Sequence, residues 1–131
     1  MFKLITLLLA NSLALAVVYL DIEVTHEKGF EDKMILKSEL MSREKVFNNK
    51  PFLLQMKNGI QLSFNADFDE KKVLEDEASI IVVEGLIQDL SAKTRSPKRF
   101  KLELKNGIKG EYKFETDEGQ RTKILITPVV K

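Results

Sequence analysis

Apolar and polar residues alternate one by one along much of this chain, and this period of two restricts the possible folds most strongly. The alternation is clearest at residues 60–68, where Ile, Leu, Phe, Ala and Phe are separated by Gln, Ser, Asn and Asp. Residues 18–25 and 100–105 show the same pattern. Because successive side chains of a β-strand point to opposite faces, the alternation predicts strands with one buried and one solvated face.

Further strands complete an all-β fold. Less regular strands are expected at residues 33–42, 51–57, 78–87, 108–115 and 121–130. After residue 20 no segment keeps a helical stripe, although residues 69–77 have room for a turn or two of helix. We therefore expect an antiparallel β-sandwich of about eight strands, with a small barrel as the alternative.

Two segments, residues 34–70 and 80–118, resemble each other and indicate an internal duplication. Both contain Lys-Asn-Gly-Ile, at 57–60 in the first copy and at 105–108 in the second, and the apolar residues around it keep the same phase. Each copy would hold a long strand, a loop and a hairpin. Two related hairpins with one apolar face each would pack face to face with approximate two-fold symmetry.

The apolar faces decide the turn of the first hairpin. A two-residue turn at Asn58-Gly59 would place its apolar residues opposite polar ones, because a slip of one residue exchanges the two faces. A three-residue loop over Lys57-Asn58-Gly59, with Gly59 in the left-handed region, avoids this conflict. This loop pairs Met56 with Ile60, Leu54 with Leu62, and Phe52 with Phe64.

The same register in the second copy places Gly107 in the left-handed region. It pairs Leu104 with Ile108, Leu102 with Gly110, and Phe100 with Tyr112. On the other face it brings Glu103 opposite Lys109 and Lys101 opposite Glu111, opposite charges that favour pairing. The apolar run at 80–83 suits a central strand. Pro128 lacks an N–H group, so the strand at 121–130 is expected at a sheet edge.

The N-terminal residues have a different composition from the rest. Lys3 is followed by no charged residue from position 4 to position 20, and Ala14-Leu15-Ala16 offers small residues at a cleavage site. This predicts a secretory signal peptide over residues 1–16, with an uncleaved inner-membrane anchor over residues 4–20 as the alternative. Residues 17–131 then form a single β-domain, which is expected in the periplasm or outside the cell.

The charge balance limits which partners are expected, and the cysteine content limits how the domain is stabilised. The chain carries 21 basic and 20 acidic residues, so its charge gives no reason to expect nucleic acid as a partner. The membrane would be reached only through an uncleaved N-terminal segment. The chain contains no cysteine, so the domain depends on its core and not on disulfides.

The sequence offers little for catalysis or for binding a metal or cofactor, and we predict no catalytic, metal or cofactor site. His26 is the only histidine; Glu23 or Glu27 could orient it as a general base, but a surface residue at a strand end is the simpler interpretation. The acidic residues between 67 and 77 lack the alternating pattern of a calcium loop, which favours a solvated connector. Carboxylates could still serve a hydrolase, and this is the least favoured function.

The most concentrated charge lies in the basic loop at residues 93–99. Lys93, Arg95, Lys98 and Arg99 could together bind an acidic protein, an anionic glycan or lipid headgroups. The sequence thus favours a non-enzymatic, exported envelope domain that binds another envelope or extracellular protein through a strand edge or its loops, or that has a structural role. The alternative is a secreted inhibitor or anionic-ligand module that uses the basic loop.

Overall fold

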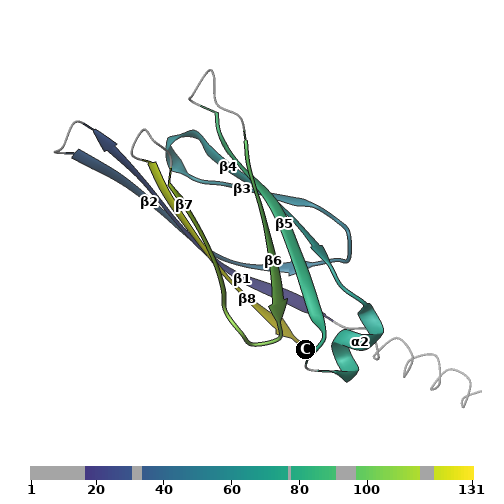
Figure 1. The fold of residues 1–131 in the computed structure, drawn as a ribbon. Coiled ribbons are helices and arrows are strands. Elements are labelled where there is room, and N and C mark those ends of the chain that lie inside the picture. The colour runs from purple at the N-terminus through teal and green to yellow at the C-terminus, as the bar shows by residue number, and fades with distance from the viewer. Residues whose placement is uncertain (1–16, 31–33, 77, 91–96, 116–119) are drawn as a thin grey trace, which may run out of the picture.

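The structure is a computed structural model that describes residues 17–30, 34–76, 78–90, 97–115 and 120–131. The strands within these ranges are β1 (Val18–Phe30), β2 (Met34–Val46), β3 (Phe52–Gln55), β4 (Ile60–Asp67), β5 (Ile80–Asp89), β6 (Lys98–Lys105), β7 (Gly110–Glu115) and β8 (Gln120–Val130). A 3-10 turn, η1 (Lys57–Gly59), and a short helix, α2 (Glu70–Glu75), connect strands of the chain. The prediction of an all-β fold is confirmed (Figure 1).

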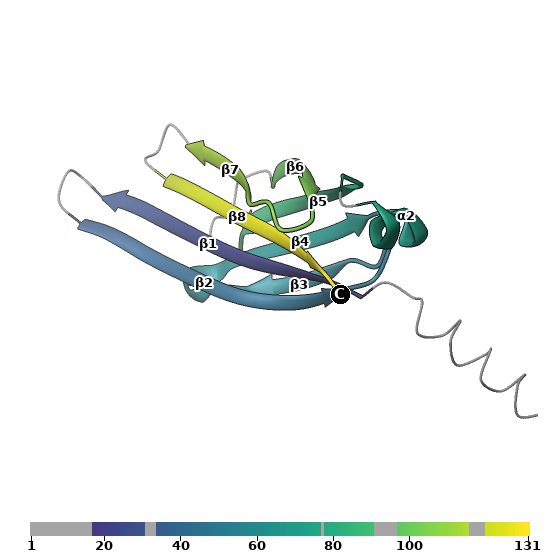
Figure 2. The ribbon, with the colours of Figure 1, turned by 90° about the horizontal axis from the view of Figure 1, so that it is seen from below.

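The strands form two antiparallel four-stranded sheets. Sheet A has the order β2-β1-β8-β7 and sheet B the order β3-β4-β5-β6. The two sheets lie over each other as the layers of a sandwich (Figure 2). The chain passes from one sheet to the other between β2 and β3 and again between β6 and β7, and in the described residues no ladder joins these strands. The ring of strands is therefore open, and the alternative of a small barrel was wrong.

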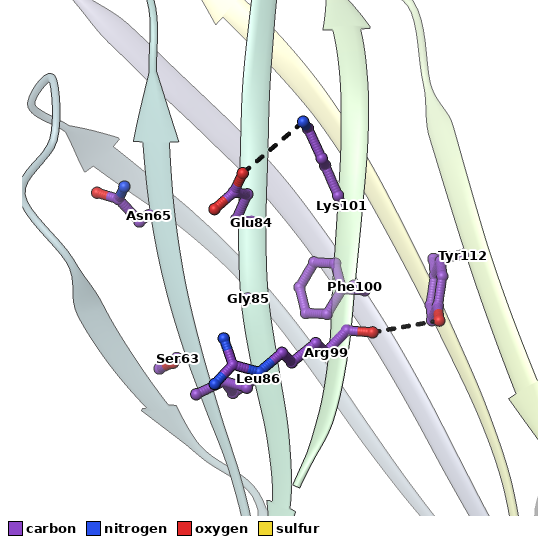
Figure 3. A pocket seen from close by; sticks show the side chains of 9 residues that line it. All are labelled: Ser63, Asn65, Glu84, Gly85, Leu86, Arg99, Phe100, Lys101 and Tyr112. Atoms are coloured by element: carbon purple, nitrogen blue, oxygen red, sulfur yellow. Dashed lines mark hydrogen bonds and ion pairs between the residues drawn. The ribbon is translucent and has the colours of Figure 1, made fainter.

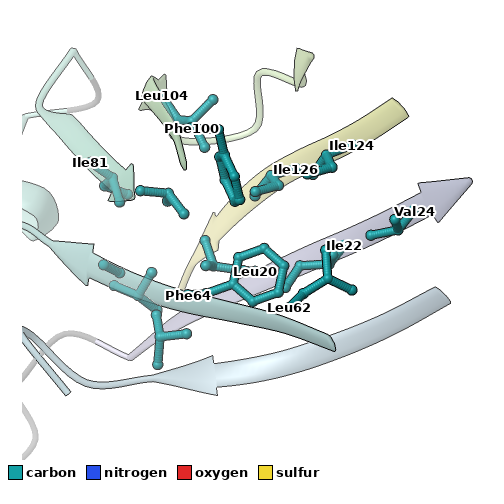
Figure 4. Close-up of a cluster of buried hydrophobic side chains, with 14 of the residues drawn as sticks. Leu20, Ile22, Val24, Leu62, Phe64, Ile81, Phe100, Leu104, Ile124 and Ile126 are labelled. Atoms are coloured by element: carbon teal, nitrogen blue, oxygen red, sulfur yellow. The ribbon is translucent and has the colours of Figure 1, made fainter. Parts of the chain in front are cut away.

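Alternation along the strands builds the core between the sheets. β1 contributes Val18, Leu20, Ile22 and Val24, all at most 1% exposed, and β8 contributes Ile124 and Ile126. Sheet B faces them with Leu62, Phe64, Ile81, Phe100 and Leu104 (Figure 4). Val83 of the same sheet is also fully buried. Burying each such side chain stabilises the fold by roughly 1.5–3 kcal/mol. The residues that alternate in the sequence thus point in turn to the core and to the surface.

The first hairpin has the predicted register. Phe52 pairs with Phe64 and Leu54 with Leu62, and the Met56 N–H donates to the Ile60 carbonyl at 2.8 Å. Gly59 lies in the left-handed region with φ of 79°. The turn is a 3-10 turn over residues 57–59, so the three-residue loop is confirmed.

The second hairpin does not form, and the predicted pairs of Leu104 with Ile108, Leu102 with Gly110 and Phe100 with Tyr112 were wrong as ladder partners. β6 pairs with β5 in sheet B, and β7 pairs with β8 in sheet A. Lys101 consequently faces Glu84 across the ladder, with 3.9 Å between Nζ and Oε1, and Glu111 binds Lys113 at 2.9 Å. The rings of Phe100 and Tyr112 still touch, with centroids 5.6 Å apart, but they do so across the two sheets.

Hydrogen bonds to β8 explain this difference between the two turns. Gly107 is left-handed as predicted, with φ of 75°, but its N–H donates to the Pro128 carbonyl at 2.8 Å. The Val130 N–H donates to the Asn106 side chain at 3.0 Å. These bonds hold the second turn against β8, so the chain continues into sheet A. The first turn is held by β5 instead, where the Leu90 N–H donates to the Gly59 carbonyl.

The position of β8 also corrects the prediction for Pro128. β8 is a central strand between β1 and β7, not an edge strand. The N and C=O of a strand residue point to the same side, and the Pro128 carbonyl accepts from Gly107 on the β7 side. The ladder with β7 ends at the pair of Gly110 and Ile126, so the missing N–H lies beyond it and breaks no ladder bond.

The two sequence copies occupy different places in the fold. The long strand of the first copy, β2, lies at the edge of sheet A, whereas the corresponding β5 is central in sheet B. The first copy changes sheet before its hairpin, and the second changes sheet at its Lys-Asn-Gly turn. The expected face-to-face packing of two related hairpins was therefore wrong, although β5 is the central strand that the run at 80–83 predicted.

A row of aromatic rings crosses the core over Gly85. Phe64 and Phe100 flank this glycine on β4 and β6, and their rings meet edge to face with centroids 5.7 Å apart. Phe52 stacks on Phe64 at 5.3 Å, and Tyr112 lies beyond Phe100. A Cβ at position 85 would overlap the ring of Phe100 and the Ser63 carbonyl oxygen, so glycine is favoured there.

Candidate functional site

The outer edge of sheet A is formed by the long strand β2. Its 13 residues pair with β1 in one unbroken register, from Val18 opposite Val46 to Phe30 opposite Met34. β2 contains neither a proline nor a bulge, which are two of the devices that commonly close an edge to further strands. The edge strand β3 of sheet B has only 4 residues. β2 therefore offers the longest open backbone edge among the described strands.

Hydrogen-bond parity identifies which backbone groups on this edge are free. Val17 and Lys131 exchange both of their backbone hydrogen bonds, so odd-numbered residues of β1 bond to β8. Even-numbered residues of β1 then bond to β2, and their partners in the register are the even-numbered residues of β2. The odd-numbered residues of β2 consequently point their N–H and C=O away from the sheet. With described side chains these are Lys37, Glu39, Met41, Arg43 and Lys45.

The same odd-numbered residues expose their side chains on the outer face. Met41 is 77% exposed, the highest value among the large hydrophobic residues that are exposed. Arg43 donates two hydrogen bonds to Asp21 at 2.6 and 2.8 Å, which lower the pKa of Asp21 and raise the pKa of Arg43. A hydrogen bond to Glu39, with 3.0 Å between Nζ and Oε1, raises the pKa of Lys37. A partner strand would thus find an exposed apolar side chain among ordered charges.

The inner side of β2 is unusually polar for a strand of a sandwich. Ser38 is buried, and the Ser42 hydroxyl donates to the Glu44 carboxylate at 2.6 Å. Inward-pointing charged residues on an edge strand oppose pairing with arbitrary strands. The edge is therefore open in its backbone but selective in its side chains, which suits a specific partner.

Lys98 and Arg99 are the two basic residues of the predicted loop that the structure places; Lys93 and Arg95 lie outside the described residues. Both placed residues are exposed on β6. Arg99 lines an open hollow of about 440 Å³ over β4, β5 and β6, together with Lys101, Glu84 and Asn65 (Figure 3). Lys98 does not line it. The cation that lies beside Arg99 in the hollow is therefore Lys101, which was not part of the predicted basic loop.

The hollow contains polar groups that could orient a ligand. Among the described residues, no carboxylate lies within 4.0 Å of the Arg99 guanidinium. The Lys101 ammonium, in contrast, forms a long ion pair with Glu84. The Asn65 side-chain oxygen is buried without a hydrogen-bond partner in the described residues. The Tyr112 hydroxyl donates to the Arg99 carbonyl at 3.3 Å and closes one side of the hollow. Such a site would accept a ligand with an acidic group.

His26 is buried, so its interpretation as a surface residue was wrong. It is 3% exposed on the inner face of β1, and its Nδ1 lies 2.8 Å from the Thr122 hydroxyl. Glu23 and Glu27 are odd-numbered residues of the same strand and lie on the opposite face, so neither can orient this imidazole. The sequence showed the alternation that makes His26 inward-facing, since it continues the series from Val18 to Val24. Its role is to bridge β1 and β8.

A buried ion pair lies beyond His26 at the same end of the sandwich. Lys28 and Asp89 approach to 2.9 Å between Nζ and Oδ2, and their side chains are 16% and 8% exposed. Lys28 belongs to sheet A and Asp89 to sheet B, so the pair joins the two layers. Neither residue stood out in the sequence, because the contact depends on how the sheets are stacked.

The acidic connector between β4 and β5 has a structural explanation. Asp69 caps α2 by accepting hydrogen bonds from the backbone N–H groups of Lys72 and Lys71, which lower its pKa. α2 fits the turn or two of helix expected there. Within the described ranges, no group of three or more His, Cys, Asp or Glu side chains is arranged to hold a metal ion. A general acid needs a raised pKa, and Asp69 has the opposite.

Comparison with known proteins adds no assignment. No protein-family model, curated protein sequence or solved structure matches this chain. In the part of the chain that the structure describes, none of the helices has the length and apolar character needed to cross a bilayer.

Proposed function

We propose that this protein is a non-enzymatic, exported cell-envelope protein that binds another protein by pairing a strand with the free edge of β2. One observation carries the proposal: five consecutive odd-numbered residues of a bulge-free edge strand present unused N–H and C=O groups. Strand addition satisfies these groups with main-chain hydrogen bonds, and the alternate side chains supply specificity. The exposed Met41 is the central apolar contact.

Export follows from the N-terminal segment. Residues 1–16 have the charge, apolar stretch and Ala-x-Ala exit of a signal peptide, and they lie outside the described residues. The first described residue, Val17, bonds to Lys131, and β1 begins at Val18. Cleavage after Ala16 would thus release the sandwich with its first strand whole, in the periplasm or outside the cell. Retention as an inner-membrane anchor is the alternative fate of residues 4–20.

A proline at an odd-numbered position of β2 tests the binding edge. Met41→Pro removes an N–H that points away from β1, so the β1–β2 ladder keeps its bonds, as the ladder of β1 with β8 does at Pro128. Lys113→Pro is the matched control, because its N–H points away from β8 at the other edge of the same sheet. Tagged parent and Lys113→Pro chains should capture the same protein from envelope extract, and Met41→Pro should lose it. Equal capture by all three would exclude the β2 edge.

The hollow beside Arg99 favours a second function, an inhibitor or anionic-ligand module. Arg99 and Lys101 would attract an acidic group. A sulfated glycan is a suitable probe. The double reversal Lys98→Glu and Arg99→Glu should abolish its binding in a calorimetric titration, while reversal of Lys45 on the far side should not. Unchanged affinity in the double variant would refute this second function.

A further inference from the structure

We propose that the strand which pairs with β2 is β2 of a second copy of this chain, antiparallel and with the two-fold axis at Ser42. This inference rests on the proposed function, because it needs the β2 edge to accept a strand. It goes further by naming the partner and the register. The product would be a continuous eight-stranded sheet made from two copies of sheet A.

The backbone permits this pairing only when the axis passes through a residue. Around such an axis every odd-numbered residue faces an odd-numbered residue of the second copy, so free N–H and C=O groups meet free groups. An axis between two residues would oppose odd to even positions and leave the free groups unmatched. The outer faces of the two sheets also lie on the same side of the combined sheet. This follows because the residues with free backbone groups are the residues with exposed side chains.

Charges then select among the registers. Within Lys37–Val46, two nine-residue pairings exist, centred on Met41 or on Ser42. The Met41 register places Lys37 opposite Lys45 of the second copy, twice, and like charges directly opposite destabilise a sheet. It also places Glu39 opposite Arg43 twice, but Arg43 is already neutralised by Asp21, so these pairs add less than the two lysine pairs cost. The Ser42 register places Glu39 opposite Lys45 twice and Met41 opposite Arg43 twice, with no like charges facing. Arg43 keeps Asp21 as its counter-ion, so the axis at Ser42 is favoured.

The same register fixes the geometry at the axis. Ser42 is even-numbered and bonds towards β1, so the two copies of Ser42 face each other as a non-hydrogen-bonded pair with about 4.5 Å between Cα atoms. That spacing lies within the range that a disulfide spans, roughly 4.4–6.8 Å. A contact between two nine-residue strand edges buries less surface than the roughly 1,200 Å² of a stable interface. We therefore expect the two copies to associate reversibly, and a disulfide can trap the dimer.

Cysteine crosslinking measures the register directly, because the natural chain contains no cysteine. Full-length Ser42→Cys should form a disulfide-linked dimer under mild oxidation, and reductant should reverse it. Lys113→Cys, on the opposite edge of sheet A, should stay monomeric under the same conditions. A Ser42→Cys chain that folds, as judged by its circular dichroism and melting curve, but stays monomeric would overturn the proposal.

A charge exchange on cysteine-free chains gives independent evidence. Sedimentation equilibrium should show weaker dimerisation for Lys45→Glu, because Glu39 then faces an acid, and recovery in the double variant Glu39→Lys, Lys45→Glu. In the Met41 register Lys45→Glu would instead face Lys37 and strengthen the dimer, which would overturn the Ser42 axis. A monomeric Ser42→Cys chain whose capture from envelope extract still depends on Met41 would leave strand addition intact and refute only the second copy as partner.

Discussion

Gly85 provides the sharpest test of the packing between the sheets. In Gly85→Ala the added Cβ would lie 2.5 Å from the Ser63 carbonyl oxygen and closer still to the ring of Phe100. The Phe100 ring can move, but the Ser63 oxygen is part of the β4–β5 ladder and cannot shift without loosening it. Overpacking of this kind costs about 1–3 kcal/mol. Alanine recovers about 0.4–1 kcal/mol through the unfolded state.

The net expectation is a loss of about 1–2 kcal/mol of unfolding free energy, which corresponds to a fall in Tm of roughly 4–8 °C for a domain of this size. Urea unfolding followed by circular dichroism measures the free energy, and a thermal melt measures Tm. Phe100→Leu as a second background should reduce the cost of Gly85→Ala, because it removes the ring contact and leaves only the Ser63 oxygen. A Gly85→Ala chain as stable as its parent, or an unchanged cost in the Phe100→Leu background, would refute the account of the aromatic row.

Three further substitutions test other parts of the fold. Gly107→Ala should cost about 1 kcal/mol, because its φ of 75° strains an L-residue although nothing lies within 4 Å of the new Cβ; a neutral effect in urea unfolding would contradict this. Lys28→Met leaves Asp89 without its cation between the sheets and should cost about 1–3 kcal/mol, and unchanged stability at neutral pH would show that the ion pair is dispensable. Asp69 has a pKa below its ordinary value of 3.8, so its contribution to stability is present above pH 3.8 and is lost as the pH falls through the lower folded pKa. Asp69→Ala should therefore be less stable than its parent at pH 7, and the difference in unfolding free energy should shrink as the pH falls below 3.8; a difference that does not shrink would argue against the charged cap.

Local patterns in the sequence correctly predicted the buried faces of strands and the geometry of the first turn, because both depend on neighbouring residues. Alternation located the inward faces of β1, β4 and β6, and it required the three-residue turn at Lys57-Asn58-Gly59. The second turn has the same residues and the same left-handed glycine, yet it leads into the other sheet. Its outcome depends on Pro128 and Val130, which lie about twenty residues further along the chain. No periodicity within residues 100–118 contains that information.

The order of the strands within each sheet could not be predicted from the sequence either. The exposed Met41 and the charges of β2 gained functional meaning only when β2 proved to be an edge strand. His26 was misjudged although the alternation of β1 continues through it; what the sequence could not supply was its hydrogen-bond partner Thr122, far along the chain. The basic loop was predicted from composition alone, and of its two described cations Arg99 lines the hollow on sheet B and Lys98 does not. The internal duplication stays a prediction about the origin of the sequence.

Residue-resolved amide exchange tests the free edge of β2 most directly. In dilute protein, the amides of the even-numbered residues Leu40, Ser42 and Glu44 should be protected by β1, while those of Met41 and Arg43 should exchange rapidly. As the protein concentration rises or the captured partner is added, the Met41 and Arg43 amides should become protected and the Leu40 amide should not change. If the odd-numbered amides are already protected in dilute protein, or remain unprotected under every condition, then β2 is not an edge that accepts a strand.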